Sequence, residues 1–246
     1  MKQRNFLATA IVAAGMSLFL YSCNGSGEGE KTADVKPEAE TPKAVEPPPP
    51  PVTKLFNFLV VKHKVANFAK WMPAYEAHDS ARLANGLNSY VIGRGIGGDS
   101  NTVLLAMKMA DVDKAKAFSA SPGLKAAMQK GGVIGMPTIN FVETVMMDST
   151  TNASTVRLIV THKVKDWDAW KKEFDSHKQA RVDAGLIDRV VGHEFGDPHM
   201  VTSAFAVSDM AKAKAFIASK DLKDKMAAAG VEGPPTMFFY NVVKKY

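Results

Sequence analysis

The sequence predicts an α+β fold in which two tandem β-α-β-β-α-β units form one intramolecular barrel. The first observation is an internal repeat, because residues 63–87 and 162–186 share many identities at a shift of 99. The second is the hydrophobic period, which alternates between strand-like and helix-like segments in the same order in both copies. The third is a first strand that is apolar on both faces, so that both faces of the sheet need to be buried.

Histidine, tryptophan, arginine and glycine recur together in the two copies. The recurring residues are His63, Trp71, His78, Arg82 and Gly86 in the first copy, and His162, Trp170, His177, Arg181 and Gly185 in the second. After a one-residue deletion the shift becomes 98, and KAKAF at 114–118 then aligns with KAKAF at 212–216. Agreement over two such blocks predicts two copies of one unit, residues 54–149 and 150–246.

The first half of each copy is predicted as a strand followed by a helix. Residues 55–63 and 156–162 are apolar, β-branched or aromatic runs, which favours strands. Each helix is expected to begin after an N-cap residue, to run to about Ala84 or Ala184, and to end at a glycine suited to the left-handed position. The N-cap residues are Asn67 and Asp166, and the glycines are Gly86 and Gly185. Pro73 has no counterpart in the second copy and predicts an early kink.

The second half of each copy is predicted as two strands, a helix and a closing strand. The expected segments are strands 90–93 and 189–192, strands 103–109 and 201–207, helices from Asp111 and Asp209 to about 130 and 229, and strands 138–146 and 236–243. The order is that of the ferredoxin-like split βαβ arrangement, a four-stranded antiparallel sheet with both helices on one face. Because the other face must also be buried, the two sheets are expected to pack face to face and close a barrel.

The tandem units resemble the dimeric α+β barrel superfamily, which includes antibiotic-biosynthesis-monooxygenase-like domains. The resemblance covers residues 55–246 and is carried by the strand end His162-Lys163-Val164, by Asp166 and Trp170, and by His177, Arg181 and Gly185, with their counterparts from His63. It implies the barrel fold. Members of the superfamily include cofactor-free oxygenases, isomerase-like and dehydratase-like enzymes and haem-binding branches, so the resemblance implies no single activity and no universal catalytic motif.

The first 53 residues predict a lipoprotein signal peptide and a tether. Lys2 and Arg4 precede an uncharged, largely apolar run at 6–20, which has the length of a secretory h-region. The run ends in Leu-Tyr-Ser-Cys at 20–23, which resembles a bacterial lipobox and implies cleavage before Cys23 and its lipidation. Residues 24–52 are rich in Pro, Gly and Glu, as in flexible linkers. We therefore expect a signal peptide at 1–22, a tether at 23–53, and membrane attachment at the periplasmic face or surface of a bacterial cell.

The candidate site residues form one stripe on the first helix of each copy, since they are spaced three or four apart. The stripes are Trp71, Tyr75, His78 and Arg82, and Trp170, Phe174, His177 and Arg181. In a structural interpretation the aromatic residues pack on the sheet, and His and Arg occupy the carbonyl end of the helix. In a catalytic interpretation the histidines act as general acid or base, and the arginines bind a carboxylate or an enolate-like oxygen. The sequence leaves both open.

His63 and His162 end the first strands. They are either core-edge histidines bonded to backbone or binding residues near the barrel mouth, together with Trp71 and Trp170. A metal site could use His63 with His78, or His162 with His177. The last strands offer no carboxylate common to both copies, because Asn241 stands where the first copy has Glu143. We therefore predict no metal and no resident cofactor, with haem suggested only by analogy with the haem-binding branch.

Three functions agree with the sequence. The net charge is +6, but the lysines are scattered among acidic residues, so nucleic-acid binding is not expected. The first function is a membrane-anchored domain that binds a small molecule. The second is a cofactor-independent monooxygenase or isomerase-like enzyme. The third is an envelope scaffold or partner-binding module whose barrel is filled by bulky side chains: Phe56, Phe58, Phe141 and Phe239.

Overall fold

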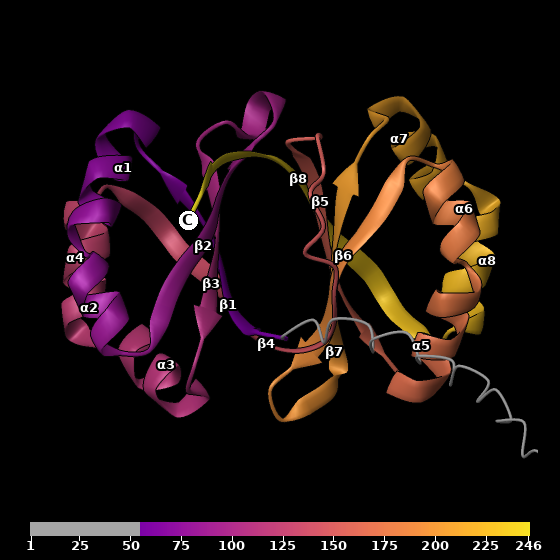
Figure 1. Cartoon of the computed structure of the whole chain (residues 1–246), viewed down its shortest axis with the longest axis horizontal. Helices are drawn as coiled ribbons and strands as arrows, with labels where there is room; N and C mark the ends of the chain where they lie inside the picture. The colour runs from indigo at the N-terminus through magenta and orange to yellow at the C-terminus, as the bar shows by residue number, and fades with distance from the viewer. Residues whose placement is uncertain (1–54) are drawn as a thin grey trace, which may run out of the picture. The chain divides into compact units, whose positions relative to one another are not determined.

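The computed structural model describes residues 55–246. The predicted signal peptide, the lipidation site Cys23 and the tether lie outside the described residues. Within 55–246, eight antiparallel strands and eight α-helices form a mixed α+β fold. α1–α4 cover the outer face of the first four strands, and α5–α8 cover the outer face of the last four (Figure 1). No helix in this part of the chain is both long and apolar enough to cross a membrane.

The elements follow the same order in residues 57–147 and 156–245. The first series is β1 (Asn57–Val65), α1 (Phe68–Ala77), α2 (Asp79–Ala84), β2 (Leu87–Gly95), the 3-10 helix η1 (Gly97–Asp99), β3 (Thr102–Met109), α3 (Val112–Ser119), α4 (Pro122–Lys130) and β4 (Val133–Met147). The second is β5 (Val156–Val164), α5 (Trp167–Ser176), α6 (Lys178–Asp183), β6 (Leu186–Glu194), β7 (Asp197–Val207), α7 (Met210–Ala218), α8 (Lys220–Ala228) and β8 (Val231–Lys245). We refer to these series as the first and second half.

The strands close into a barrel in the order β1-β3-β2-β8-β5-β7-β6-β4. Two long strands make the closure, because β4 and β8 each have 15 residues. β4 pairs with β1 of its own half through its first part and with β6 through its last part, and β8 pairs in the same way with β5 and β2. The sequence underestimated the length of both strands. Most of the added residues lie at the strand starts, where Val133 and Ile134 pair with β1, and Val231 and Glu232 pair with β5. Residues 142–147 and 240–245, largely within the predicted strands, form the β4–β6 and β2–β8 seams.

Successive strand residues face the barrel interior and the helices in turn, as the period of two requires. On β5, Arg157 and Ile159 line a cavity inside the barrel, whereas Leu158, Val160 and His162 line one beneath the helices. Both faces of the sheet are therefore buried, which explains the absence of polar alternation in the first strands.

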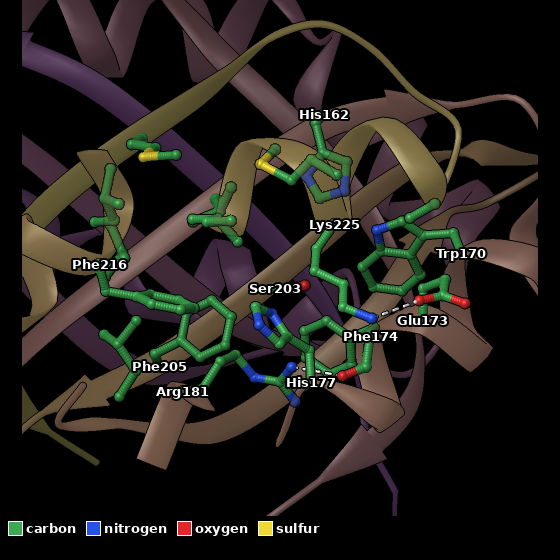
Figure 2. Close-up of a pocket in the computed structure, with 18 residues that line it drawn as sticks. His162, Trp170, Glu173, Phe174, His177, Arg181, Ser203, Phe205, Phe216 and Lys225 are labelled. Carbon is green, nitrogen blue, oxygen red and sulfur yellow. Dashed lines mark hydrogen bonds and ion pairs between the residues drawn. The ribbon is translucent and has the colours of Figure 1, made fainter. Parts of the chain in front are cut away.

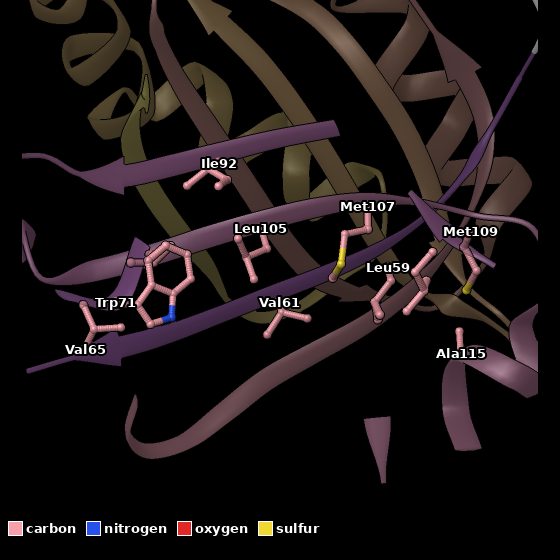
Figure 3. Close-up of a cluster of buried hydrophobic side chains, with 11 residues drawn as sticks. Leu59, Val61, Val65, Trp71, Ile92, Leu105, Met107, Met109 and Ala115 are labelled. Atoms are coloured by element: carbon pink, nitrogen blue, oxygen red, sulfur yellow. The ribbon is translucent and has the colours of Figure 1, made fainter. Parts of the chain in front are cut away.

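The helix-facing core of the first half is shown in Figure 3, where Leu59 and Val61 of β1 lie beside Leu105 and Met107 of β3, with Trp71 at one end of the cluster. The barrel interior holds a cavity of about 260 Å³. Of the four phenylalanines expected to fill the barrel, Phe58 lines this cavity, while Phe141 and Phe239 pack in the helix-facing clusters. The fold therefore does not support a filled barrel.

The predicted helix ends are largely confirmed. The side chains of Asn67 and Asp166 accept hydrogen bonds from the third residue of each helix, and Gly86 and Gly185 have φ angles of 70° and 73°. The expectation of one continuous first helix per copy is wrong, because each breaks at its histidine. Pro73 lies inside α1 and is not the cause of the break, since α5 has no proline and ends at the equivalent residue.

The second helices also differ from the prediction. Each is split in two by a serine that caps the following helix, where the Oγ of Ser121 or Ser219 accepts a hydrogen bond from the backbone three residues on. The split shortens every helix to ten residues or fewer. Short helices of this length depend on packing against the sheet rather than on their own stability.

Both seams place a glycine where strands of the two halves meet. A Cβ added at Gly192 on β6 would lie closer than 3.0 Å to the carbonyl oxygen of Glu143 on β4. A Cβ at the equivalent Gly93 on β2 would meet the ring of Tyr240 on β8 at a similar distance. The backbone carbonyl cannot move away without breaking strand pairing, so the β4–β6 seam requires a residue without a side chain.

Gly192→Ala is expected to lower the free energy of unfolding by about 1–3 kcal/mol because it forces the seam apart. Gly98→Ala is the matched control, since an added Cβ there meets nothing within 4 Å. Urea denaturation of both variants checks this expectation. Equal stability of the two variants would show that the β4–β6 seam accommodates a side chain at position 192.

Candidate functional site

Each half contains a cavity between its helices and the helix-facing side of its sheet. The second-half cavity has a volume of about 100 Å³ and the first-half cavity about 80 Å³. All eight sequence-predicted residues line them: His63, Trp71, His78 and Arg82 in the first half, and His162, Trp170, His177 and Arg181 in the second. The structure thus brings together the two sets that the sequence singled out. Their roles stay predictions.

Arg181 on α6 forms hydrogen bonds that connect α5 with strand β6 of the sheet. Its Nη1 donates to the carbonyl oxygen of Phe174 at 2.5 Å, and its Nε and Nη2 donate to the two carboxylate oxygens of Asp188 at 2.8 and 2.7 Å. The guanidinium carbon lies 3.6 Å from the centre of the Phe174 ring. Because Asp188 already balances its charge, this geometry favours the structural interpretation of Arg181 over binding of a ligand carboxylate.

Arg82 makes similar contacts in the first half, with fewer hydrogen bonds. It donates to the carbonyl oxygen of Tyr75 at 2.6 Å and to Asp79 at 2.9 Å, and its guanidinium lies 3.7 Å from the centre of the Tyr75 ring. Ser89 occupies the position equivalent to Asp188 and bonds to the Tyr75 hydroxyl at 2.7 Å instead. The Nε of Arg82 is therefore buried without a hydrogen-bond partner among the described residues.

His63 and His162 are buried and have no hydrogen-bond partner for either ring nitrogen within residues 55–246. The predicted bond to backbone at the core edge is therefore not formed. Each ring instead contacts the tryptophan of its own half, with centroids 5.6 Å apart for Trp71 and 5.5 Å for Trp170. Burial lowers the pKa of both histidines to about 4, so each ring is neutral at pH 7 and offers one donor and one acceptor.

The second-half cavity holds a further buried polar atom. The Oγ of Ser203 on β7 is buried without a partner in the described structure, and it lies beside the strand that carries His162 (Figure 2). Leu105 occupies the equivalent position in the first half. The second-half cavity is thus mostly apolar, but it contains unsatisfied groups from two side chains.

The rim of the second-half cavity is also charged. His177 lies 2.8 Å from Asp221 through its Nε2. Lys225 lies 3.4 Å from Glu173 (Figure 2). The equivalent first-half residues, Gly123, Ala127 and Ala74, carry no charge. Sequence reasoning missed Ser203, Asp221 and the Glu173–Lys225 pair because it looked for identities between the halves. The differences between the halves would have identified them.

No family model matches the sequence, and no curated protein matches it. Solved structures do match its fold. One is a candidate monooxygenase from Fusobacterium nucleatum, with 12% identity, 78% of this chain and 94% of the other covered, and a TM-score of 0.53. A candidate chlorite dismutase shows 14% identity, coverage of 76% and 95%, and a TM-score of 0.52. At these identities the likeness shows the fold alone.

The prediction of no cofactor is contradicted by the same set of structures. It includes chlorite dismutases, one of them a variant from Candidatus Nitrospira defluvii with 10% identity, coverage of 77% and 93%, and a TM-score of 0.50. In this chain His63 and His162 would be suitable haem ligands, since their ring nitrogens are unpaired. The two cavities are much smaller than the roughly 300–1,000 Å³ of pockets for drug-sized ligands, so a haem does not fit beside either histidine.

Within residues 55–246, no group of three or more His, Cys, Asp or Glu side chains is arranged to hold a metal ion.

The buried histidines predict that acid destabilises the fold. The unfolded chain takes up a proton at each histidine below its ordinary pKa of 6.5, whereas the folded chain does so only near pH 4. The free energy of unfolding is therefore fully retained above about pH 6.5 and falls between pH 6.5 and 4, by on the order of 3 kcal/mol per histidine.

His162→Leu should remove about half of this pH-dependent loss, measured by urea denaturation at pH 7 and pH 5. The control is His199→Leu, since His199 is exposed. An unchanged pH dependence in His162→Leu would show that this histidine is not buried in its neutral form.

Proposed function

We propose that residues 55–246 bind a small, mostly apolar molecule with one polar group in the second-half cavity. The observation that carries this proposal is the combination of His162 and Ser203, whose polar atoms are buried, unpaired and directed at an apolar cavity. A buried polar group without a partner costs about 1–3 kcal/mol, so a ligand or water that satisfies these atoms is favoured.

The volume of the cavity limits the ligand. An apolar cavity of about 150 Å³ holds benzene, and the second-half cavity is about 100 Å³. Lys225 and Glu173 at the rim are partly exposed, so rotation of these side chains can widen the entrance. A single aromatic ring or a short branched chain matches this space.

The chemistry of the cavity limits the polar group. Neutral His162 can donate one hydrogen bond and accept another, and the Ser203 hydroxyl can do either. The walls include Leu158, Phe205 and Met237, which favour an apolar body. A hydroxyl or carbonyl group on a small apolar molecule would satisfy both polar side chains, whereas a fully charged group would be poorly solvated there.

The experiment compares phenol with toluene, which has the same number of non-hydrogen atoms and no hydroxyl. The unmodified chain is expected to bind phenol about three- to tenfold more tightly, measured by ligand-observed NMR, because one hydrogen bond contributes about 0.5–1.5 kcal/mol. Ser203→Ala should lose this preference. Ser119→Ala, in the first-half cavity, is the control and should retain it. Equal affinities of the unmodified chain for both compounds would contradict the proposal.

A cofactor-independent monooxygenase or isomerase-like reaction is a second candidate. It is favoured by the His177–Asp221 contact at the rim of the same cavity, because a carboxylate at Nε2 orients an imidazole for proton transfer. A candidate monooxygenase among the structures of this fold agrees with it. Binding alone returns the ligand unchanged, whereas this reaction would alter it, so mass spectrometry of the recovered compound separates the two functions.

We also propose that the two halves are diverged copies of one ferredoxin-like unit that pair within a single chain. Support comes from the spaced identities in the sequence and from the matching order of elements. On this basis the first-half cavity is a second copy of the site that shares His63, His78 and Arg82. It has Ala74, Leu105 and Ala127 in place of Glu173, Ser203 and Lys225.

Anchoring to a bacterial membrane through lipidated Cys23 remains a proposal, supported by the charged, apolar and lipobox segments of residues 2–23. Cys23→Ala in the full-length chain should release the protein from the membrane fraction, because a protein without the lipid keeps no stable anchor. Cell fractionation measures the release, and incorporation of labelled palmitate measures the lipidation. Unchanged membrane association of Cys23→Ala would contradict the proposal.

A further inference from the structure

The cavity inside the barrel, of about 260 Å³, contains none of the sequence-predicted site residues. We call it the barrel cavity. Strands of both halves line it, and so do residues 148–152 of the connection between β4 and β5. Ser149, Thr150 and Thr151 of that connection are exposed to solvent, which places the entrance at this end.

Arg157 on β5 lies in this cavity and is 7% exposed. Its Nη1 donates to the carbonyl oxygens of Ser154 and Val156 at 2.6 and 2.9 Å. Its Nε and Nη2 have no hydrogen-bond partner, and no carboxylate pairs with it, among the described residues. A buried guanidinium is normally paired with an anion, because its desolvation is otherwise uncompensated.

The other charges of the cavity do not balance Arg157. Arg189 also lines the cavity, but it pairs with Asp148 at 3.1 Å and donates to the carbonyl oxygen of Thr150 at 2.7 Å. Lys245 adds a further positive charge at the exposed end of β8. Asp148 is therefore already engaged, and the cavity retains an excess of positive charge.

Neutral donors lie next to Arg157. Tyr240 pairs directly with it across β5 and β8, and burial raises the pKa of the Tyr240 hydroxyl to about 12. At neutral pH that hydroxyl is protonated and can donate. Thr202 on β7 adds another hydroxyl to the lining.

Most polar strand residues of the cavity belong to the second half, and Tyr90 on β2 is the first-half exception. The second half contributes Arg157, Thr202, Tyr240 and Lys245, where the first half has Phe58, Leu104, Val142 and Met147 at the equivalent positions. A ligand that matches both sides therefore carries an anionic group at one end and an apolar body at the other.

We propose that the barrel cavity binds a small organic monocarboxylate, with its carboxylate on Arg157 and Tyr240 and its apolar body against Phe58, Leu104 and Val142. One unpaired guanidinium suits one negative charge, and a carboxylate accepts two parallel hydrogen bonds from Nε and Nη2. The volume lies between the roughly 150 Å³ that holds benzene and the roughly 300 Å³ of small drug pockets, which suits benzoate or hexanoate.

The test titrates the full-length chain with benzoate and hexanoate, and with the uncharged benzamide and hexanamide. Isothermal calorimetry is expected to show that the carboxylates bind about ten- to a hundredfold more tightly than the amides, as for hydrogen bonds to charged groups. In Arg157→Gln this difference should disappear. Arg94→Gln makes the same charge change outside the barrel cavity, where Arg94 donates to the carbonyl oxygen of Ser100, and should retain it.

Two further variants keep the test decisive. Tyr240→Phe preserves the ring and should weaken benzoate binding about three- to tenfold, including in the case that Arg157→Gln fails to fold. Ser176→Ala, at the exposed end of α5, lines none of the three cavities and should leave benzoate binding unchanged. Full discrimination in Arg157→Gln, unchanged binding in Tyr240→Phe, or inorganic phosphate binding as tightly as benzoate would each overturn the proposal.

Discussion

The burial of both faces of one sheet is the constraint on which the rest of the structure depends. Helices cover only the outer face of the strands, so the inner face is removed from water only when the sheet curves onto itself. The 15-residue strands β4 and β8 provide this closure, since each pairs with a strand of its own half and then with a strand of the other. Gly93 and Gly192 allow the close approach at the two seams.

Closure creates two chemically separate kinds of cavity. Because side chains alternate along a strand, His162 and Arg157 belong to the same strand, β5, yet open into different spaces. The helix-facing cavity is small, apolar and bordered by short helices that depend on packing. The barrel cavity is larger and surrounded by paired strands, so its walls are the more rigid. Short helices suit a ligand that enters between them, whereas paired strands suit a charge held in a fixed position.

Much of the fold could be predicted because local rules and the repeat agree. Asn67 and Asp166 cap helices as their residue types predict, and the apolar runs form the expected strands. The helix break at His78 and His177 could not be predicted, because it depends on a tertiary contact. The guanidinium four residues later bonds the carbonyl three residues before the histidine, which holds the chain across the break. The seam pairing is also tertiary, since it joins segments more than 40 residues apart.

Comparison of the two halves also shows why the candidate site was only partly predictable. Residues shared by both halves, such as Arg82 and Arg181, make the same tie between helix and aromatic ring, so their recurrence reports a requirement of the fold. The unpaired groups have a different distribution. Ser203 and Arg157 stand where the first half has Leu105 and Phe58, residues that need no partner. A polar group that replaces an apolar one in a buried position lowers stability unless something satisfies it. Differences between the two halves are therefore better indicators of ligand sites here than identities.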